Sequence, residues 1–118
     1  MESRISIKDG KNVVVFKVEG DFDNLLSIKY KNLITEIIAR KRCDLIVFDL
    51  SNVSFIDSSG IGLLLGRYKQ ICEYKGQLII CGINSNIKKT IAISGLAMII
   101  ETYEDIYENI KGLVNVYE

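Results

Sequence analysis

The stretch Phe55-Ile-Asp-Ser-Ser-Gly-Ile-Gly-Leu-Leu-Leu-Gly66 decides the fold, because a strand changes into a helix within it. Before it lies Leu45–Leu50, a short apolar run rich in β-branched and aromatic residues, which is typical of a buried strand. After it, apolar side chains recur at helical spacing from a start near Ser58. This stripe comprises Ile61, Leu64, Leu65, Tyr68, Ile71 and Cys72. The sequence therefore predicts a strand, a turn that carries a serine, and a helix.

Three polar side chains stand at this turn, namely Asp57, Ser58 and Ser59. Each can accept a hydrogen bond from the N–H groups that the first turn of a helix leaves unpaired. A well-capped helix start therefore explains the three residues without any further function. The central helix is expected to stop at Gly76, with Tyr74 and Lys75 in its last turn.

The rest of the chain alternates between strand and helix patterns. Ile5–Ile7 and Val13–Val18 flank a turn-rich segment and predict an antiparallel hairpin. Asp23 or Asn24 caps a helix that runs to about Arg40. Its expected inward face is Leu26, Tyr30, Leu33, Ile34 and Ile37. A strand is expected next at Leu78–Cys81, followed by a helix at Asn86–Ser94 that Ser85 caps and Gly95 ends. A short strand is expected at Met98–Ile100. The last element is expected to be a helix that Thr102 and Asp105 open and that buries Ile106, Ile110, Leu113 and Tyr117. This order predicts a single α/β domain over residues 1–118, with a mixed, mainly parallel sheet of roughly four to five strands and about four helices.

Composition narrows the function classes. The 118 residues are 48% hydrophobic and 25% charged, with 15 basic and 15 acidic side chains, and this neutral balance argues against a nucleic-acid binder. No targeting segment and no bilayer-spanning run is visible, so no membrane association is expected. The three cysteines, Cys43, Cys72 and Cys81, lack metal-ligand spacing and are expected to be buried in a protein of the reducing cytoplasm. Histidine is absent, which removes the commonest general base. We expect no enzyme activity, no metal and no cofactor.

The run Asp57-Ser-Ser-Gly-Ile-Gly62, followed by Leu65-Gly-Arg-Tyr-Lys-Gln70, resembles the signature of the STAS domain family. The resemblance extends in order to Gly20-Asp-Phe-Asp23, Ile80-Cys-Gly-Ile83 and Ile93-Ser-Gly-Leu96, and so spans nearly the whole chain. Within the family the chain looks most like the sporulation antagonists of anti-sigma factor F. The segments after Asp23 and before Ser94 depart from the family pattern, which bears on partner specificity more than on fold.

This resemblance implies a function that the residue pattern alone does not. The first serine of the run, Ser58, would be phosphorylated by an anti-sigma factor that is also a serine kinase and that itself holds the ATP or ADP. Unmodified protein would bind that factor and release the sporulation sigma factor, and a serine phosphatase would reset the switch. The residues carried over as partner-binding are Asp23, Asp57, Ser59, Gly60, Ile61, Gly62 and Leu63. Leu63 lies off the main apolar stripe and is the foremost surface candidate beside the serine, although a sheet and a neighbouring helix could bury it instead.

Several alternatives remain open at this stage. Ser59 could be the modified residue in place of Ser58. The helix start, with Gly60 and Gly62, could bind an anion weakly, although no Walker or dinucleotide motif is present. Gly62 and Gly66 are expected to let the helix approach its neighbour closely. A serine hydrolase is disfavoured, because no G-x-S-x-G elbow exists and Lys69 would lie about 16 Å along the helix. A general-stress antagonist, a stressosome module or a lipid-transport scaffold is also compatible with the pattern.

Overall fold

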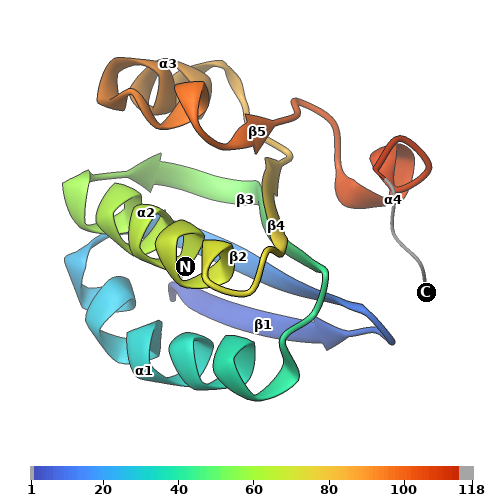
Figure 1. Cartoon of the computed structure of the whole chain (residues 1–118). Helices are drawn as coiled ribbons and strands as arrows, with labels where there is room; N and C mark the ends of the chain where they lie inside the picture. Colours follow the sequence, from blue (N-terminus) through green and yellow to red (C-terminus); the bar gives the residue numbers. More distant parts are fainter. Residues whose placement is uncertain (1, 115–118) are drawn as a thin grey trace.

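A computed structural model describes residues 2–114 of the chain as one α/β domain (Figure 1). The elements follow in the order β1 (Arg4–Asp9), β2 (Val13–Phe22), α1 (Asn24–Lys41), β3 (Leu45–Ile56), α2 (Ser58–Cys72), β4 (Gln77–Cys81), α3 (Ser85–Ser94), the 3₁₀ helix η1 (Leu96–Met98), β5 (Glu101–Thr102) and α4 (Tyr107–Ile110). The five strands form one sheet in the order β1-β2-β3-β4-β5. Strands β1 and β2 are antiparallel, and the other pairs are parallel. The predicted fold class is therefore confirmed.

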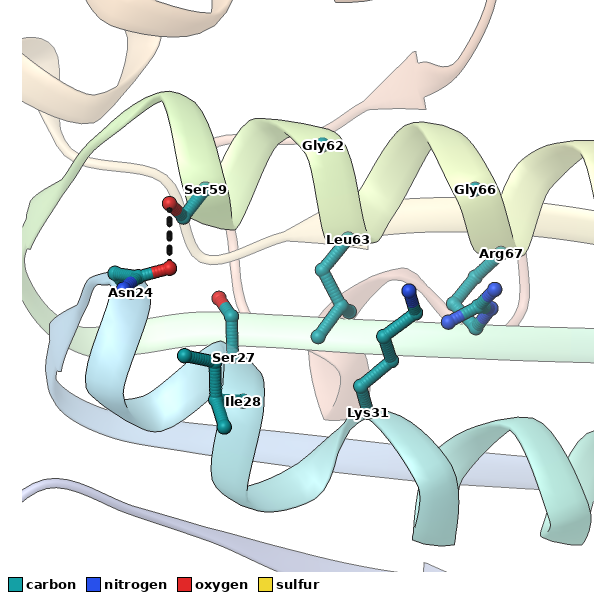
Figure 2. Close-up of a pocket in the computed structure, with 9 residues that line it drawn as sticks. All are labelled: Asn24, Ser27, Ile28, Lys31, Ser59, Gly62, Leu63, Gly66 and Arg67. Carbon is teal, nitrogen blue, oxygen red and sulfur yellow. Dashed lines mark hydrogen bonds between the residues drawn. The ribbon is translucent and has the colours of Figure 1, made fainter.

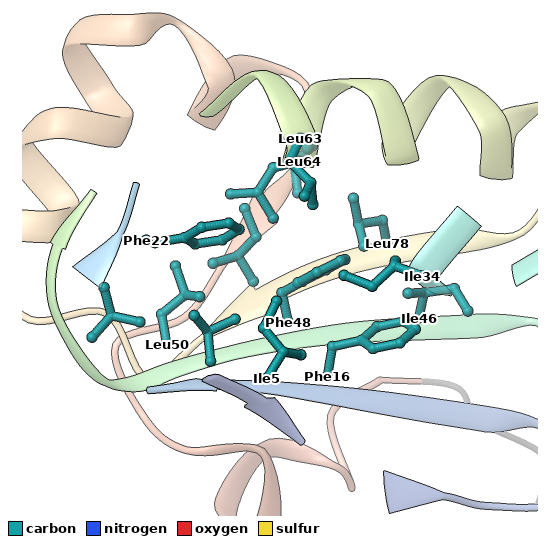
Figure 3. Packing of buried hydrophobic residues seen from close by; sticks show 14 of the residues in the cluster. Ile5, Phe16, Phe22, Ile34, Ile46, Phe48, Leu50, Leu63, Leu64 and Leu78 are labelled. Atoms are coloured by element: carbon teal, nitrogen blue, oxygen red, sulfur yellow. The ribbon is translucent and has the colours of Figure 1, made fainter. Parts of the chain in front are cut away.

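The central strands are apolar on both sides, because helices cover both faces of the sheet. On β2, Phe16 and Val18 belong to the large core, whereas Val13 and Val15 face the smaller one. The large core gathers buried side chains from α1, α2 and α3, and the rings of Phe16 and Phe48 stack at its centre with centroids 5.1 Å apart. Figure 3 shows this packing beneath α2. The smaller core is closed by Tyr107 and Ile110 of α4 together with Val114.

Strand β3 runs to Ile56, six residues beyond the predicted end at Leu50. Its second half pairs with the end of β2, where the register shifts twice, between Lys17 and Glu19 and between Gly20 and Asp21. The apolar run alone did not predict this half of the strand, because its polar residues Asn52 and Ser54 point outward at alternate positions. The extension carries the chain to the carboxyl end of β3, where the serine turn, Asp57–Ser59, begins.

Other local predictions are wrong. Helix α2 ends at Cys72, and turn residues lead from there to Gly76. Asn84, not Ser85, caps α3 by accepting the Ile87 N–H. The segment expected as a strand at Met98–Ile100 instead begins in η1, and the edge strand is Glu101–Thr102, so Thr102 opens no helix.

The C-terminal helix and the cysteines also depart from the predictions. In this segment Asp105 bonds the N–H of Ile106 and the amide of Asn109, and the short α4 follows. Ile110 is buried as expected, but the side chains expected inside at Leu33, Ile106 and Leu113 are exposed. Tyr117 lies outside the described residues. Cys43 and Cys81 are buried as expected, whereas Cys72 is exposed. Across residues 2–114, the structure has no helix with the length and apolar character needed to cross a membrane.

Candidate functional site

The serine turn, Asp57–Ser59, joins β3 to α2 through a capped helix start. Asp57 has extended backbone angles and its carboxylate Oδ1 accepts the N–H groups of Ser59, at 2.8 Å, and of Gly60, at 3.1 Å. Ser58 is therefore the first residue of the helix, and its side chain is exposed. Because the cap residue satisfies two of the free N–H groups, Ser58 needs no structural role for its own hydroxyl.

Gly60 holds the start of α2 against the end of β2. A methyl group added at this glycine would lie 2.5 Å from the carbonyl oxygen of Phe22 and 2.8 Å from a side-chain carbon of Ile56. The same Phe22 carbonyl accepts the N–H of Asp57 at 3.3 Å. Only a residue without Cβ permits this approach, so Gly60 sets the position of the turn.

The first turn of α1 lies beside the serine turn. Asp23 caps α1 by accepting the Leu26 N–H at 3.0 Å, as predicted, and the next residue, Asn24, accepts a hydrogen bond from the Ser59 hydroxyl at 3.2 Å (Figure 2). Two helix N-termini, each with a partial positive charge, thus start at the same edge of the domain, and an aspartate caps each. Asp23 therefore directly precedes the residue through which α1 bonds to the serine turn.

A groove of about 330 Å³ extends from Ser59 along the space between α1 and α2. Its lining is Asn24, Ser27, Ile28, Lys31, Ser59, Gly62, Leu63, Gly66 and Arg67. Figure 2 shows Lys31 reaching from α1 and Arg67 from α2 into this space. Burial lowers the pKa of Arg67, because a guanidinium loses hydration there. The groove therefore combines two cationic side chains with apolar walls.

The predicted site residues differ in their access to a partner. Ser58 and Gly62 are exposed, and Asp23, Asp57, Ser59 and Ile61 are partly exposed. Leu63 is only 5% exposed because α1 covers it, so its prediction as an exposed contact is wrong. Gly60 is buried too and acts through packing. The expected close approach at Gly62 and Gly66 is also wrong, since a Cβ at either would find no atom within 4 Å.

Sequence reasoning missed four residues, three that are exposed and one that is buried between α1 and α2. Leu25, Ile28 and Phe55 are large apolar side chains that the structure leaves exposed. Ile28 lines the groove that reaches Ser59, Phe55 lies three residues before Ser58, and Leu25 follows Asn24, which bonds to Ser59. Their signal in the sequence is apolar character off the periodic stripe, which does not by itself separate a surface residue from a buried one. The sequence assigned no role to Arg67 by itself, and the structure buries it one helical turn after Leu63, in the lining of the same groove.

The family is settled by comparison with known proteins. The family model described as STAS domain matches residues 4–109. The chain belongs to the STAS domain family. An anti-sigma F factor antagonist of Paenibacillus polymyxa is 32% identical over 105 residues, which cover 89% of this chain and 90% of that protein. An anti-sigma-B factor antagonist of Listeria monocytogenes is 28% identical over 111 residues, covering 94% and 91%.

Solved structures share the fold of this STAS domain. The anti-sigma factor antagonist SpoIIAA in its unphosphorylated form aligns with a TM-score of 0.74 at 21% identity, covering 95% of this chain and 99% of that one. The Bacillus cell fate determinant SpoIIAA in the phosphorylated form aligns with a TM-score of 0.72 at 23% identity, covering 93% and 99%. An anti-sigma factor antagonist from Mycobacterium paratuberculosis aligns with a TM-score of 0.81 at 21% identity, covering 94% of this chain and 93% of that one.

Proposed function

We propose that this STAS domain is an anti-sigma factor antagonist of the sporulation type, controlled by phosphorylation of Ser58. Unmodified, it binds an anti-sigma factor through the serine turn and so frees the sporulation sigma factor. The same anti-sigma factor, using the ATP that it binds, phosphorylates Ser58 and thereby releases the antagonist. A serine phosphatase restores the binding form. The protein acts in the cytoplasm as a binding partner, with no enzyme activity of its own.

The observation that carries this proposal is the exposed Ser58 at the first position of a helix whose cap is another residue. A phosphate there adds roughly −1.5 to −2 charges without removing a hydrogen bond from the cap. The helix N-terminus favours that charge by about 0.3–1 kcal/mol. We therefore expect the fold to tolerate the modification.

The same charge acts against an interface. An opposing carboxylate or nucleotide phosphate about 5 Å away repels it by roughly 3 kcal/mol per charge pair at an effective dielectric constant of ~20. That energy corresponds to about a hundredfold loss of affinity. Phosphorylation would thus switch binding while leaving the domain folded. The names of the relatives support the antagonist part of this proposal.

The apolar side chains around the serine are the proposed contacts that supply affinity. Leu25 and Ile28 are exposed in the first turns of α1, which bonds to Ser59 through Asn24, and Phe55 is exposed three residues before Ser58. Burial of such side chains at the centre of an interface is favourable. Partly exposed Asp23, Asp57, Ser59 and Ile61, with Gly62, would complete the contact surface.

Phosphate mapping tests the site. The protein is incubated with the cognate anti-sigma factor and ATP, and intact mass and peptide masses are measured. We expect one phosphate, lost in Ser58→Ala and retained in Ser59→Ala. Labelling of Ser58→Ala together with loss in Ser59→Ala would move the site to Ser59.

Binding of the apolar surface is tested by calorimetry with unmodified protein. Leu25→Ser is expected to weaken binding at least tenfold with little change in melting temperature, which corresponds to about 1.4 kcal/mol or more. Ile93→Ser is the matched control, because Ile93 is 88% exposed on α3, compared with 78% for Leu25. Equal affinities of the two variants would remove Leu25 from the interface.

A second candidate is antagonism of anti-sigma-B, favoured by the Listeria relative. Its test is direct competition: the protein is mixed with the anti-sigma F and anti-sigma-B factors of its own organism. The sporulation assignment expects capture of the former. Preferential capture of the latter would assign the protein to the general-stress system.

A further inference from the structure

The groove between α1 and α2 contains a buried cation that no residue of the described chain neutralises. Arg67 is 8% exposed, and neither its Nε nor its Nη1 has a hydrogen-bond partner. No ion pair joins it to any residue from 2 to 114. These two nitrogens lose their hydration without gaining an acceptor, so the isolated domain carries a cost at this position.

Other groups of the groove point to the same kind of ligand. Ser27 is 7% exposed, and its hydroxyl also has no hydrogen-bond partner among residues 2–114. Lys31 adds a second positive charge from the opposite wall (Figure 2), and the part of the chain that the structure describes contributes no acidic residue to the lining. An anion in this space would find two cations, a free hydroxyl and no repelling carboxylate.

The walls also indicate what accompanies the anionic group. Leu63 and Ile28 supply apolar surface, and the open space above Gly62 and Gly66 leaves room beside them. A phosphate, by contrast, is usually held by several backbone N–H groups at a helix start or a glycine-rich loop. At the start of α2 the N–H groups of Ser59 and Gly60 are already bound to Asp57. The lining therefore suits a carboxylate with a short apolar chain better than a phosphate.

We propose that the α1–α2 groove is a binding site for a small aliphatic carboxylic acid, with its carboxylate at Arg67, Lys31 and Ser27 and its carbon chain along Leu63 and the Cβ-free face of Gly62 and Gly66. The site is separate from the modified serine, although its outer end reaches Ser59 and Ile28. It does not depend on the identity of the protein partner.

The proposal is tested by titrating the full chain with sodium butyrate and monitoring ¹H–¹⁵N NMR spectra. Sodium butyrate replaces sodium chloride stepwise, so the ionic strength stays constant. We expect saturable shifts of the Arg67 Nε–H signal and of the Ser27 and Gly66 amides. Inorganic phosphate at the same concentrations is expected to bind more weakly. A linear, unsaturable response to butyrate, or tighter binding of phosphate, would overturn the assignment.

Three variants locate the site. Arg67→Gln is expected to abolish saturation, and Lys31→Gln, at an exposed position that leaves the fold intact, to weaken binding roughly threefold. Gly66→Leu fills the groove without changing its charge, because a Cβ there meets no atom within 4 Å, and should also abolish binding. Lys69→Gln is the matched control, since Lys69 is exposed on α2 but does not line the groove. Unchanged butyrate affinity in Gly66→Leu and Lys31→Gln would overturn the proposal even if Arg67→Gln failed to fold.

Discussion

Replacing Gly60 with alanine tests how the serine turn is held in place. The new methyl group would lie 2.5 Å from the Phe22 carbonyl oxygen, about 1 Å inside normal van der Waals contact. That oxygen is part of the backbone of β2 and accepts the Asp57 N–H, so it is not free to move aside. Overpacking of this kind costs about 1–3 kcal/mol. The start of α2, including Ser58, would have to shift away from the sheet.

Gly62→Ala is the matched control on the same helix. Its methyl group meets nothing within 4 Å, and alanine is favoured over glycine in a helix by up to about 1 kcal/mol. Because both glycines lie in α2, the gain in helix propensity is common to the two variants. They should therefore differ by the overpacking cost of roughly 1–3 kcal/mol, or about 4–12 °C in melting temperature for a domain of this size. Urea unfolding and calorimetry measure the difference. Equal stabilities of Gly60→Ala and Gly62→Ala would refute the close approach at Gly60.

Three further predictions follow from the structure. Asp57→Ala should lower the free energy of unfolding by about 1 kcal/mol, whereas Asp57→Asn should retain most of it, because asparagine also caps helices; equal losses in urea unfolding would contradict the cap. An aromatic disulfide reagent at pH 8 should modify one thiol rapidly, because Cys72 is exposed. Burial raises the pKa of Cys43, and it raises the pKa of Cys81 to about 12, so both should react slowly. The fast phase should vanish in Cys72→Ser. Burial raises the pKa of Tyr74 to about 12, and its neutral phenol donates a hydrogen bond to the Cys43 carbonyl. The resulting stabilisation is complete below the unfolded pKa of ~10 and is lost as the pH rises through 12. The stability gap between wild type and Tyr74→Phe should thus narrow from pH 9 to pH 12, and a constant gap would contradict this.

The strand–turn–helix unit was predictable because its signals are local. Apolar runs mark the buried strands, and the caps at Asp23 and Asp57 follow from residue type and position alone. The segment at Met98–Ile100 failed because a short apolar run does not distinguish a strand from a 3₁₀ turn that packs on the core.

The details of the site were less accessible to sequence reasoning. Helix α2 packs against the sheet and against α1 at once, so its buried surface is wider than one periodic stripe and includes Leu63 and Arg67. The role of Gly60 depends on the Phe22 carbonyl, 38 positions earlier in the chain. Leu25 and Phe55 are exposed because no other element of the described chain packs over them. Such facts arise from tertiary packing, which residue spacing does not encode.

The central claim is that a phosphate on Ser58 turns off binding without unfolding the domain. Its most direct test is the dissociation constant of the anti-sigma factor for two purified forms of this protein, unmodified and phosphorylated on Ser58, at one salt concentration. The account predicts about a hundredfold weaker binding of the phosphorylated form, with melting temperatures within a few degrees of each other. Equal affinities of the two folded forms would contradict it.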